Sequence, residues 1–269
     1  MSEFVETAYA KLNLALHVRE KTAGGYHRIE TLFVFCKDGD ELTAESAEDV
    51  SLEIAGAFAA ELDSGSNLVL DATTALREAS GTTSGARLEL IKNLPVSSGI
   101  GGGSADAAAA LRLLNRLWGL NWPKDRLEPI ARELGADVAP CLYSQPMRGE
   151  GRGDDLALVE LGLAEHPVLL INPRTALSTV DVFARWDGVD RGPLVNWRDG
   201  RNDLEQSATE LAPLIQTVLA WLSAQPGVEC VRMSGSGATC FALFETERAR
   251  DDAAEAVPRE WWRLATRLR

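Results

Sequence analysis

A glycine-rich segment that leads into a helix-forming stretch is the feature that most limits how this chain can fold. Residues 95–105 contain four glycines, three serines and no charged side chain. Glycine adopts backbone angles closed to other residues and lets a ligand approach the main chain. A helix N-terminus adds unpaired N–H groups and the positive end of a dipole. The segment predicts a phosphate-binding loop formed by Pro95, Val96, Ser97, Ser98, Gly99, Ile100, Gly101, Gly102, Gly103, Ser104 and Ala105.

The loop does not match the better-known glycine-loop motifs. A Walker A loop ends in Gly-Lys-Ser or Gly-Lys-Thr, whereas Gly103 is followed by Ser104 and Ala105. A dinucleotide-binding fingerprint requires a glycine where Ser104 stands and an acidic residue about 20 positions later, which is not evident. The HRD and DFG elements of protein kinases are absent. A tight strand-to-helix turn without a ligand remains the alternative, although three consecutive glycines are more than such a turn requires.

Composition and charge narrow the class of partner. The 269 residues are enough for one large domain or two ordinary ones. The net charge of −13 disfavours nucleic acid and anionic membranes, so we expect backbone dipoles and a few cations to hold any phosphate. The four cysteines form no CxxC pair, which argues against a zinc site or a disulfide framework. No stretch resembles a signal peptide or a membrane span, and the sequence predicts a cytoplasmic protein.

Hydrophobic periodicity predicts strands and helices that do not alternate regularly. Strands are expected over residues 4–18, 29–35, 41–43, 50–54, 86–91, 168–171, 228–233 and 240–245. Helices are expected over residues 67–78, 125–134, 179–184 and 211–224 and from Ser104, as N-cap, to Gly119, with turns over 22–27 and 38–40. This order favours an α+β fold over a doubly wound sheet. A break near residues 161–167 predicts one domain over residues 1–163 and a second over 164–269.

Four further segments stand in a fixed order around the glycine loop. They are Ala-Lys-Leu-Asn-Leu-Ala-Leu at 10–16, Gly-Tyr-His-Arg-Ile-Glu-Thr at 25–31, Leu-Gly-Ala-Asp-Val-Ala-Pro at 134–140 and Arg-Met-Ser-Gly-Ser-Gly-Ala-Thr at 232–239. With them the chain resembles the GHMP family of small-molecule kinases. Within that family it is similar to the kinases that act on 4-diphosphocytidyl-2-C-methyl-D-erythritol. The family often has Gly-Gly where this chain has Ser97 and Ser98.

The resemblance covers about residues 8–244 and implies a fold and an activity. The fold would combine an N-terminal domain like domain 2 of ribosomal protein S5 with a C-terminal ferredoxin-like domain. ATP would be the phosphoryl donor, with Mg²⁺, and the acceptor would be the hydroxyl at carbon 2 of the cytidine-diphosphate-linked methylerythritol. The protein would act on this small molecule as a monomer or weak homodimer, without nucleic acid or membrane.

The resemblance also assigns roles to individual residues. Asp137 would be the catalytic base and Lys11 its cationic partner; the cytidine-diphosphate substrate would contact Asn13, Tyr26, His27, Thr179 and Phe183. Asn67 and Lys92 match positions near the adenine, and Ser104 is a candidate near magnesium, whose ligands stay unknown. From the residues alone, each has a plainer interpretation as a turn, surface or core residue. For the segment 235–237 the sequence favours neither of two interpretations, a second phosphate cradle or a plain hairpin turn.

Three other functions compete with this one. Another GHMP kinase, for homoserine, mevalonate or a sugar, would leave Tyr26 and His27 without a nucleobase to bind. A non-catalytic nucleotide-binding module requires Lys11 and Asp137 to lie apart. A dehydrogenase would bind NAD rather than ATP.

Overall fold

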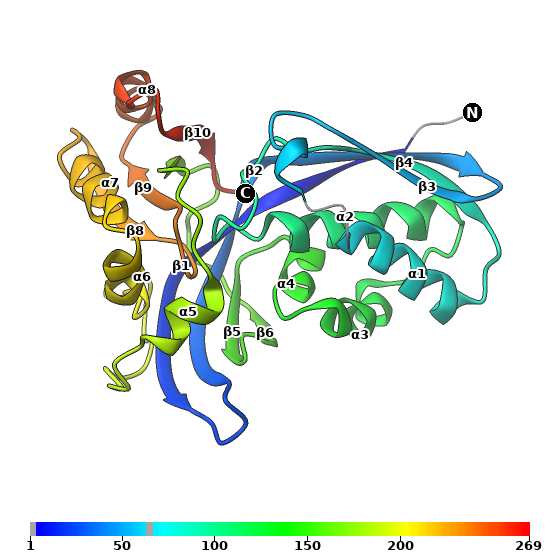
Figure 1. The fold of residues 1–269 in the computed structure, drawn as a ribbon, viewed down its shortest axis with the longest axis horizontal. Helices are drawn as coiled ribbons and strands as arrows, with labels where there is room; N and C mark the ends of the chain where they lie inside the picture. The colour runs from blue at the N-terminus through cyan, green and yellow to red at the C-terminus, as the bar shows by residue number, and fades with distance from the viewer. Residues whose placement is uncertain (1–3, 63–66) are drawn as a thin grey trace. The chain divides into compact units, whose positions relative to one another are not determined.

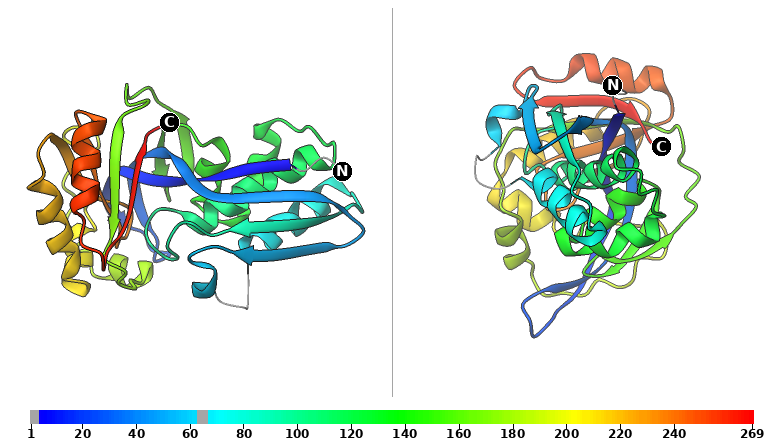
Figure 2. Two further views of the ribbon diagram at one scale, coloured as in Figure 1. Left: turned by 90° about the horizontal axis from the view of Figure 1, so that it is seen from above. Right: turned by 90° about the vertical axis from the view of Figure 1, so that its right-hand side faces the viewer.

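The computed structural model describes residues 4–62 and 67–269 and divides into two compact units (Figures 1 and 2). Unit 1 contains the described residues of Met1–Ala10, Asp38–Val96 and Gly101–Ser144; unit 2 contains Lys11–Lys37, Ser97–Ile100 and Gln145–Arg269. The chain therefore passes between the units several times, twice within the glycine loop. The division predicted between residues 163 and 164 cuts the sequence only once, and it stays a prediction.

Unit 1 is a sheet with helices along one face (Figure 1). Its strands have the order β3-β4-β2, with β3 parallel to β4 and β4 antiparallel to β2. The strands are β3 (Val50–Ala55), β4 (Gly85–Ile91) and the second half of β2 (His27–Ala47), with the start of β1 (Phe4–Lys21). The helices are the short η1 (Ala59–Glu61), α1 (Leu68–Ser80), α2 (Gly102–Leu117), α3 (Lys124–Leu134) and α4 (Val138–Tyr143). Four successive buried alanines in α2 (107–110) allow close packing around it.

Unit 2 holds the rest of β1 and β2 together with a second sheet. The first half of β2 pairs antiparallel with β5 (Met147–Gly151), which pairs with β6 (Asp155–Leu158). The second sheet has the order β10-β7-β9-β8 and is antiparallel throughout. Its strands are β7 (Pro167–Asn172), β8 (Val228–Met233), β9 (Cys240–Phe244) and β10 (Trp262–Arg267). The helices are α5 (Thr179–Ala184), α6 (Glu205–Leu211), α7 (Leu214–Ser223) and α8 (Glu247–Ala256).

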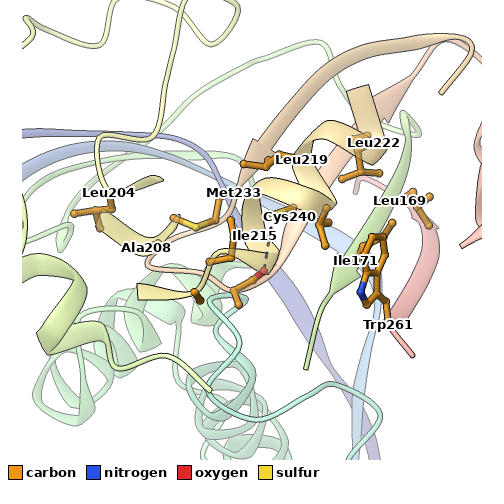
Figure 3. Packing of buried hydrophobic residues seen from close by; sticks show 14 of the residues in the cluster. Leu169, Ile171, Leu204, Ala208, Ile215, Leu219, Leu222, Met233, Cys240 and Trp261 are labelled. Atoms are coloured by element: carbon orange, nitrogen blue, oxygen red, sulfur yellow. Dashed lines mark hydrogen bonds between the residues drawn. The ribbon is translucent and has the colours of Figure 1, made fainter. Parts of the chain in front are cut away.

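The core of unit 2 lies between its antiparallel sheet and the helices beside it. All six residues of β7 are buried, as expected for a strand covered on both faces. Ile215, Leu219 and Leu222 of α7 belong to one buried cluster with Leu169 and Ile171 of β7 (Figure 3). This packing fixes the β8–β9 connection, residues 234–239, which carries part of the site described below.

The two sheets and their helices confirm the α+β expectation, but several local predictions are wrong. Residues 38–40 are not a turn, because β2 runs through them to Ala47. Position 39 requires glycine, because the Cβ of any other residue would lie 2.0 Å from the carbonyl oxygen of Ala8. Ser104 is not an N-cap, since α2 starts at Gly102 behind Gly101, which has a φ of 68°. The helix predicted over 211–224 is interrupted, with α6 ending at Leu211 and α7 beginning after Pro213.

In the part of the chain that the structure describes, no helix combines the length and apolar character required to cross a membrane.

Candidate active site

Residues 97–100 of the glycine loop are fixed within unit 2 by hydrogen bonds to their main chain. The Lys11 N–H donates to the carbonyl oxygen of Ile100 at 2.9 Å, and the Ser234 hydroxyl donates to that of Gly99 at 2.9 Å. Gly99 has a φ of 80°, and a Cβ on it would lie 2.5 Å from the Ser234 carbonyl oxygen and 2.6 Å from that of Gly237. Only glycine fits this position, because both the backbone angle and the close approach exclude a side chain.

The second half of the loop forms the start of α2 in unit 1. The first N–H groups of a helix have no acceptor within it, so those of Gly102, Gly103 and Ser104 are available to an anion. The side chains of Ile100 and Ala105 are buried. These two residues can therefore contact a ligand only through their main chain. The predicted phosphate loop therefore has the donors it requires, although the contribution of each of its eleven residues stays a prediction.

A buried ion triad lies beside the first turn of α2 in unit 1. Lys92 at the end of β4 contacts the carboxylates of Asp40 and Asp106, the latter at 2.6 Å. Burial opposes the charge of Lys92, but the two carboxylates outweigh it and raise its pKa. Burial, reinforced by the charge of Asp40, raises the pKa of Asp106 to about 7 although Lys92 opposes the shift. The ammonium of Lys92 thus joins β2, β4 and α2 at the base of the loop, and a role beside the adenine stays a prediction.

Lys11 and Asn13 form a buried polar pair on β1. Lys11 is 2% exposed, so the interpretation as a surface lysine is wrong. Its Nζ donates to Asn13 Oδ1 at 2.9 Å and lies 5.4 Å from the centre of the Phe33 ring. Asn13 Nδ2 donates in turn to Thr31 Oγ1 at 2.8 Å, which fixes the amide orientation. The two residues share a face of β1, as their spacing predicts.

Asp137 precedes α4 in unit 1, directly after the sequence Leu-Gly-Ala. It is the N-cap residue, with a φ of −84°, but its side chain makes no capping bond to the helix. The carboxylate is half-buried. Lys11 lies in unit 2, and the pairing of the two residues in catalysis stays a prediction.

Aromatic residues from two distant segments meet in unit 2. The ring centres of His27 and Phe183 lie 5.1 Å apart, and Trp186 contacts His27 edge-on at 5.6 Å. Burial and the charge of Lys21 lower the pKa of His27 from 6.5, so the ring is neutral at pH 7 and offers one donor and one acceptor. Tyr26 is 57% exposed, with the Arg152 guanidinium over its ring. The structure thus brings His27 and Phe183 together and adds Trp186, three residues after Phe183, which the sequence analysis did not single out.

The segment 234–239 packs against the glycine loop rather than standing alone as a turn. It connects β8 and β9 as a hairpin, and the Thr239 N–H donates to the Ser98 carbonyl oxygen at 3.1 Å. Ser236 and Thr179 share a hydroxyl hydrogen bond of 2.8 Å. Within the motif at 232–239, the sequence marks Gly235–Gly237 but does not indicate the contacts of Ser234, whose partners are 135 and 221 residues away in the chain.

The sequence does not identify which residues would bind Mg²⁺. Among residues 4–62 and 67–269, no group of three or more His, Cys, Asp or Glu side chains is placed to hold a metal ion.

Comparison with known families and structures identifies the type of protein. The family model described as the GHMP kinases N terminal domain matches residues 67–145, and that described as GHMP kinases C terminal matches 185–264. A 4-diphosphocytidyl-2-C-methyl-D-erythritol kinase of Rhizorhabdus wittichii is 50% identical over 98% of this chain and 94% of its own length.

Solved structures give the same result at the level of the fold. A crystal structure of 4-(cytidine 5'-diphospho)-2C-methyl-D-erythritol kinase superposes with a TM-score of 0.84 at 31% identity, covering 98% of both chains. A homoserine kinase from Cytophaga hutchinsonii reaches 0.75 at 21% identity over 99% of this chain and 96% of its own, which supports the shared fold alone. The two-domain kinase fold expected from the resemblance is thereby confirmed. The chain belongs to the GHMP kinases and, among them, to the family of 4-diphosphocytidyl-2-C-methyl-D-erythritol kinases.

Proposed function

We propose that this kinase transfers the γ-phosphoryl group of ATP to the 2-hydroxyl of 4-diphosphocytidyl-2-C-methyl-D-erythritol, a step of the non-mevalonate route to isoprenoid precursors. The observation that carries the proposal is the similarity, over nearly the whole chain, to relatives named for this substrate. The contact between His27 and Phe183 supports it, because a planar nucleobase requires an aromatic surface and a neutral hydrogen-bonding ring. Homoserine and mevalonate contain no base that would use them.

The reaction itself requires alignment, charge neutralisation and removal of one proton. The acceptor oxygen forms a bond to the γ-phosphorus as the bond to the β,γ-bridging oxygen breaks, and ADP leaves. Asp137 accepts the proton of the attacking hydroxyl. Lys11 offsets negative charge at the reacting oxygens.

The glycine loop holds the triphosphate through main-chain N–H groups. The N-terminus of α2 supplies these donors and its dipole, which suits a chain with a net charge of −13. Mg²⁺ commonly keeps waters and binds through substrate phosphates plus one or two protein oxygens. The hydroxyl of Ser104, in the first turn of α2, is a ligand of the right type. Bound there, the ion would neutralise phosphate charge.

The substrate side of the site consists of unit 2 residues. Asn13 would contact the diphosphate-linked polyol, and His27 would bond the cytosine while Tyr26 and Phe183 cover its faces. The hydroxyl of Thr179, next to Ser236, would complete the pocket. The protein would act in the cytoplasm as a monomer or weak homodimer, without nucleic acid or membrane partners.

Steady-state kinetics with a coupled ADP assay tests the proposal. The purified protein is expected to release ADP from ATP only when the cytidine-diphosphate-linked methylerythritol is present. Homoserine and mevalonate serve as matched acceptors, since both are substrates of kinases with this fold. Turnover with either of them, but not with the cytidylyl compound, would refute the assignment.

A further inference from the structure

The β8–β9 connection contains a serine that bonds to two parts of the site at once. Ser234 is 0% exposed. Its hydroxyl accepts a hydrogen bond from the Asn13 N–H at 3.1 Å and donates one to the Gly99 carbonyl oxygen at 2.9 Å. One buried oxygen atom therefore joins the strand that carries Lys11 and Asn13 to the loop that begins the phosphate cradle.

The surroundings of Ser234 leave little room for a substitute. Gly235, the next residue, would place a Cβ 3.0 Å from the Gly99 carbonyl oxygen and 3.2 Å from Asn13 Oδ1. Backbone thus lies directly against backbone, and a buried N–H and C=O that lose their partner stay unsatisfied. Removing the hydroxyl is expected to shift the loop, the strand or both.

The contacts around Ser234 also set the register of Lys11. The Lys11 N–H bonds to the Ile100 carbonyl oxygen, one residue beyond Gly99, while the Asn13 N–H bonds to Ser234. The strand and the loop are therefore held at two adjacent points. Because phosphoryl transfer depends mainly on positioning, a displacement of about 1 Å between these segments is enough to slow it about 100-fold.

We propose that Ser234 is a positioning residue that holds the phosphate loop and the Lys11–Asn13 strand in the register required for transfer. This inference rests on the proposed function, since it assigns the loop to ATP and the strand to the acceptor. It also gives a role to the residue directly before the segment 235–237, whose function the sequence left open. The hydroxyl acts through Gly99 and Asn13 and does not itself contact the reacting atoms.

The experiment compares Ser234→Ala with Thr73→Val in the full chain. Both changes remove a hydroxyl from a residue that is 0% exposed. The Thr73 hydroxyl, in α1 of unit 1, donates to the Val69 carbonyl oxygen of the same helix at 2.7 Å. The two variants are therefore matched in burial and lost bonding and differ in what the hydroxyl holds.

Ser234→Ala is expected to lower kcat about 10- to 100-fold, with the Kd of a non-hydrolysable ATP analogue changed less than about threefold. Thr73→Val is expected to lower the melting temperature similarly and kcat less than about threefold. Ser234→Cys keeps the approximate shape of the side chain and replaces the hydroxyl with a weakly hydrogen-bonding thiol. If the alanine variant does not fold, the kcat of the cysteine variant tests the inference in its place.

Near wild-type kcat in Ser234→Ala, or an equal loss in Thr73→Val, overturns the inference while leaving the proposed function intact. An inactive wild-type protein with the cytidylyl substrate would instead contradict the proposed function.

Discussion

At the scale of the residue, the glycine loop contains one position that requires glycine and one that tolerates its absence. Gly99 combines a φ of 80° with backbone oxygens inside 2.6 Å of a Cβ, whereas Ser97 is exposed with a φ of 50°. The serine at position 97 bears only the strain of a left-handed backbone, about 1–2 kcal/mol.

We expect Gly99→Ala to raise the KM for ATP at least about tenfold and to lower the melting temperature, because the loop must move away from Ser234 and Gly237. Ser97→Gly, the matched change, should keep both values and alter the free energy of unfolding by less than about 1 kcal/mol. Urea unfolding and ATP titration measure both effects. An active, stable Gly99→Ala variant would mean that the loop is not held as described.

Asp137 provides the second prediction at this scale. Asp137→Asn keeps the size of the side chain and removes its ability to accept a proton, so kcat should fall about 10²- to 10⁴-fold. Binding of a non-hydrolysable ATP analogue, measured by calorimetry, should change little. Asp71→Asn, on an exposed position of α1, is the control and should be neutral. Parallel losses of turnover and nucleotide binding in Asp137→Asn would indicate a structural role instead.

At the scale of the element, the Asp40–Lys92–Asp106 triad holds two strands and the start of α2 together. Lys92→Met would leave two buried carboxylates without a cation, and we expect a loss of about 3–5 kcal/mol in the free energy of unfolding. Asp106→Asn removes one of two like charges and should cost less than about 1 kcal/mol at pH 7. Urea unfolding of both variants measures the difference.

The pH dependence of the triad follows from the pKa of Asp106. Because its folded-state pKa is raised from 3.8 to about 7, ionisation is less favourable in the folded than in the unfolded chain. Its contribution to stability is full below pH 3.8 and is lost as the pH rises through 7. Wild-type stability should therefore decrease across this window relative to Asp106→Asn. An identical pH profile for the two proteins would contradict the assigned environment.

Elements with a clear hydrophobic period were predictable, and those defined by tertiary contacts were not. The helix α3 and the strands β4, β7, β8 and β9 lie within two residues of their expected limits. Short α4 was missed because it contains Pro140 and only six residues. The charged helix α8 was also not predicted, because it buries only three residues and its sequence therefore shows almost no apolar stripe.

At the scale of the whole molecule, the sequence proposes motifs for the site, which stay predictions, but does not indicate how they are joined. The glycine loop, Lys11, His27 and Asp137 stand out because each lies in a short local motif. The contacts of Ser234 and Asp40 were not predicted, since their partners come from distant segments and no local pattern encodes such contacts. Each unit is assembled from several segments, so the chain order alone does not reveal which motifs share a unit.

The position of the transferred phosphate tests the central claim most directly. With ATP and 4-diphosphocytidyl-2-C-methyl-D-erythritol, phosphorus NMR of the product should show one new phosphomonoester, coupled to the methyl-bearing carbon 2, formed in equal amount with ADP. The Asp137→Asn variant should form it far more slowly under the same conditions. A phosphate on another hydroxyl, or ADP formed without any phosphorylated acceptor, would contradict the account.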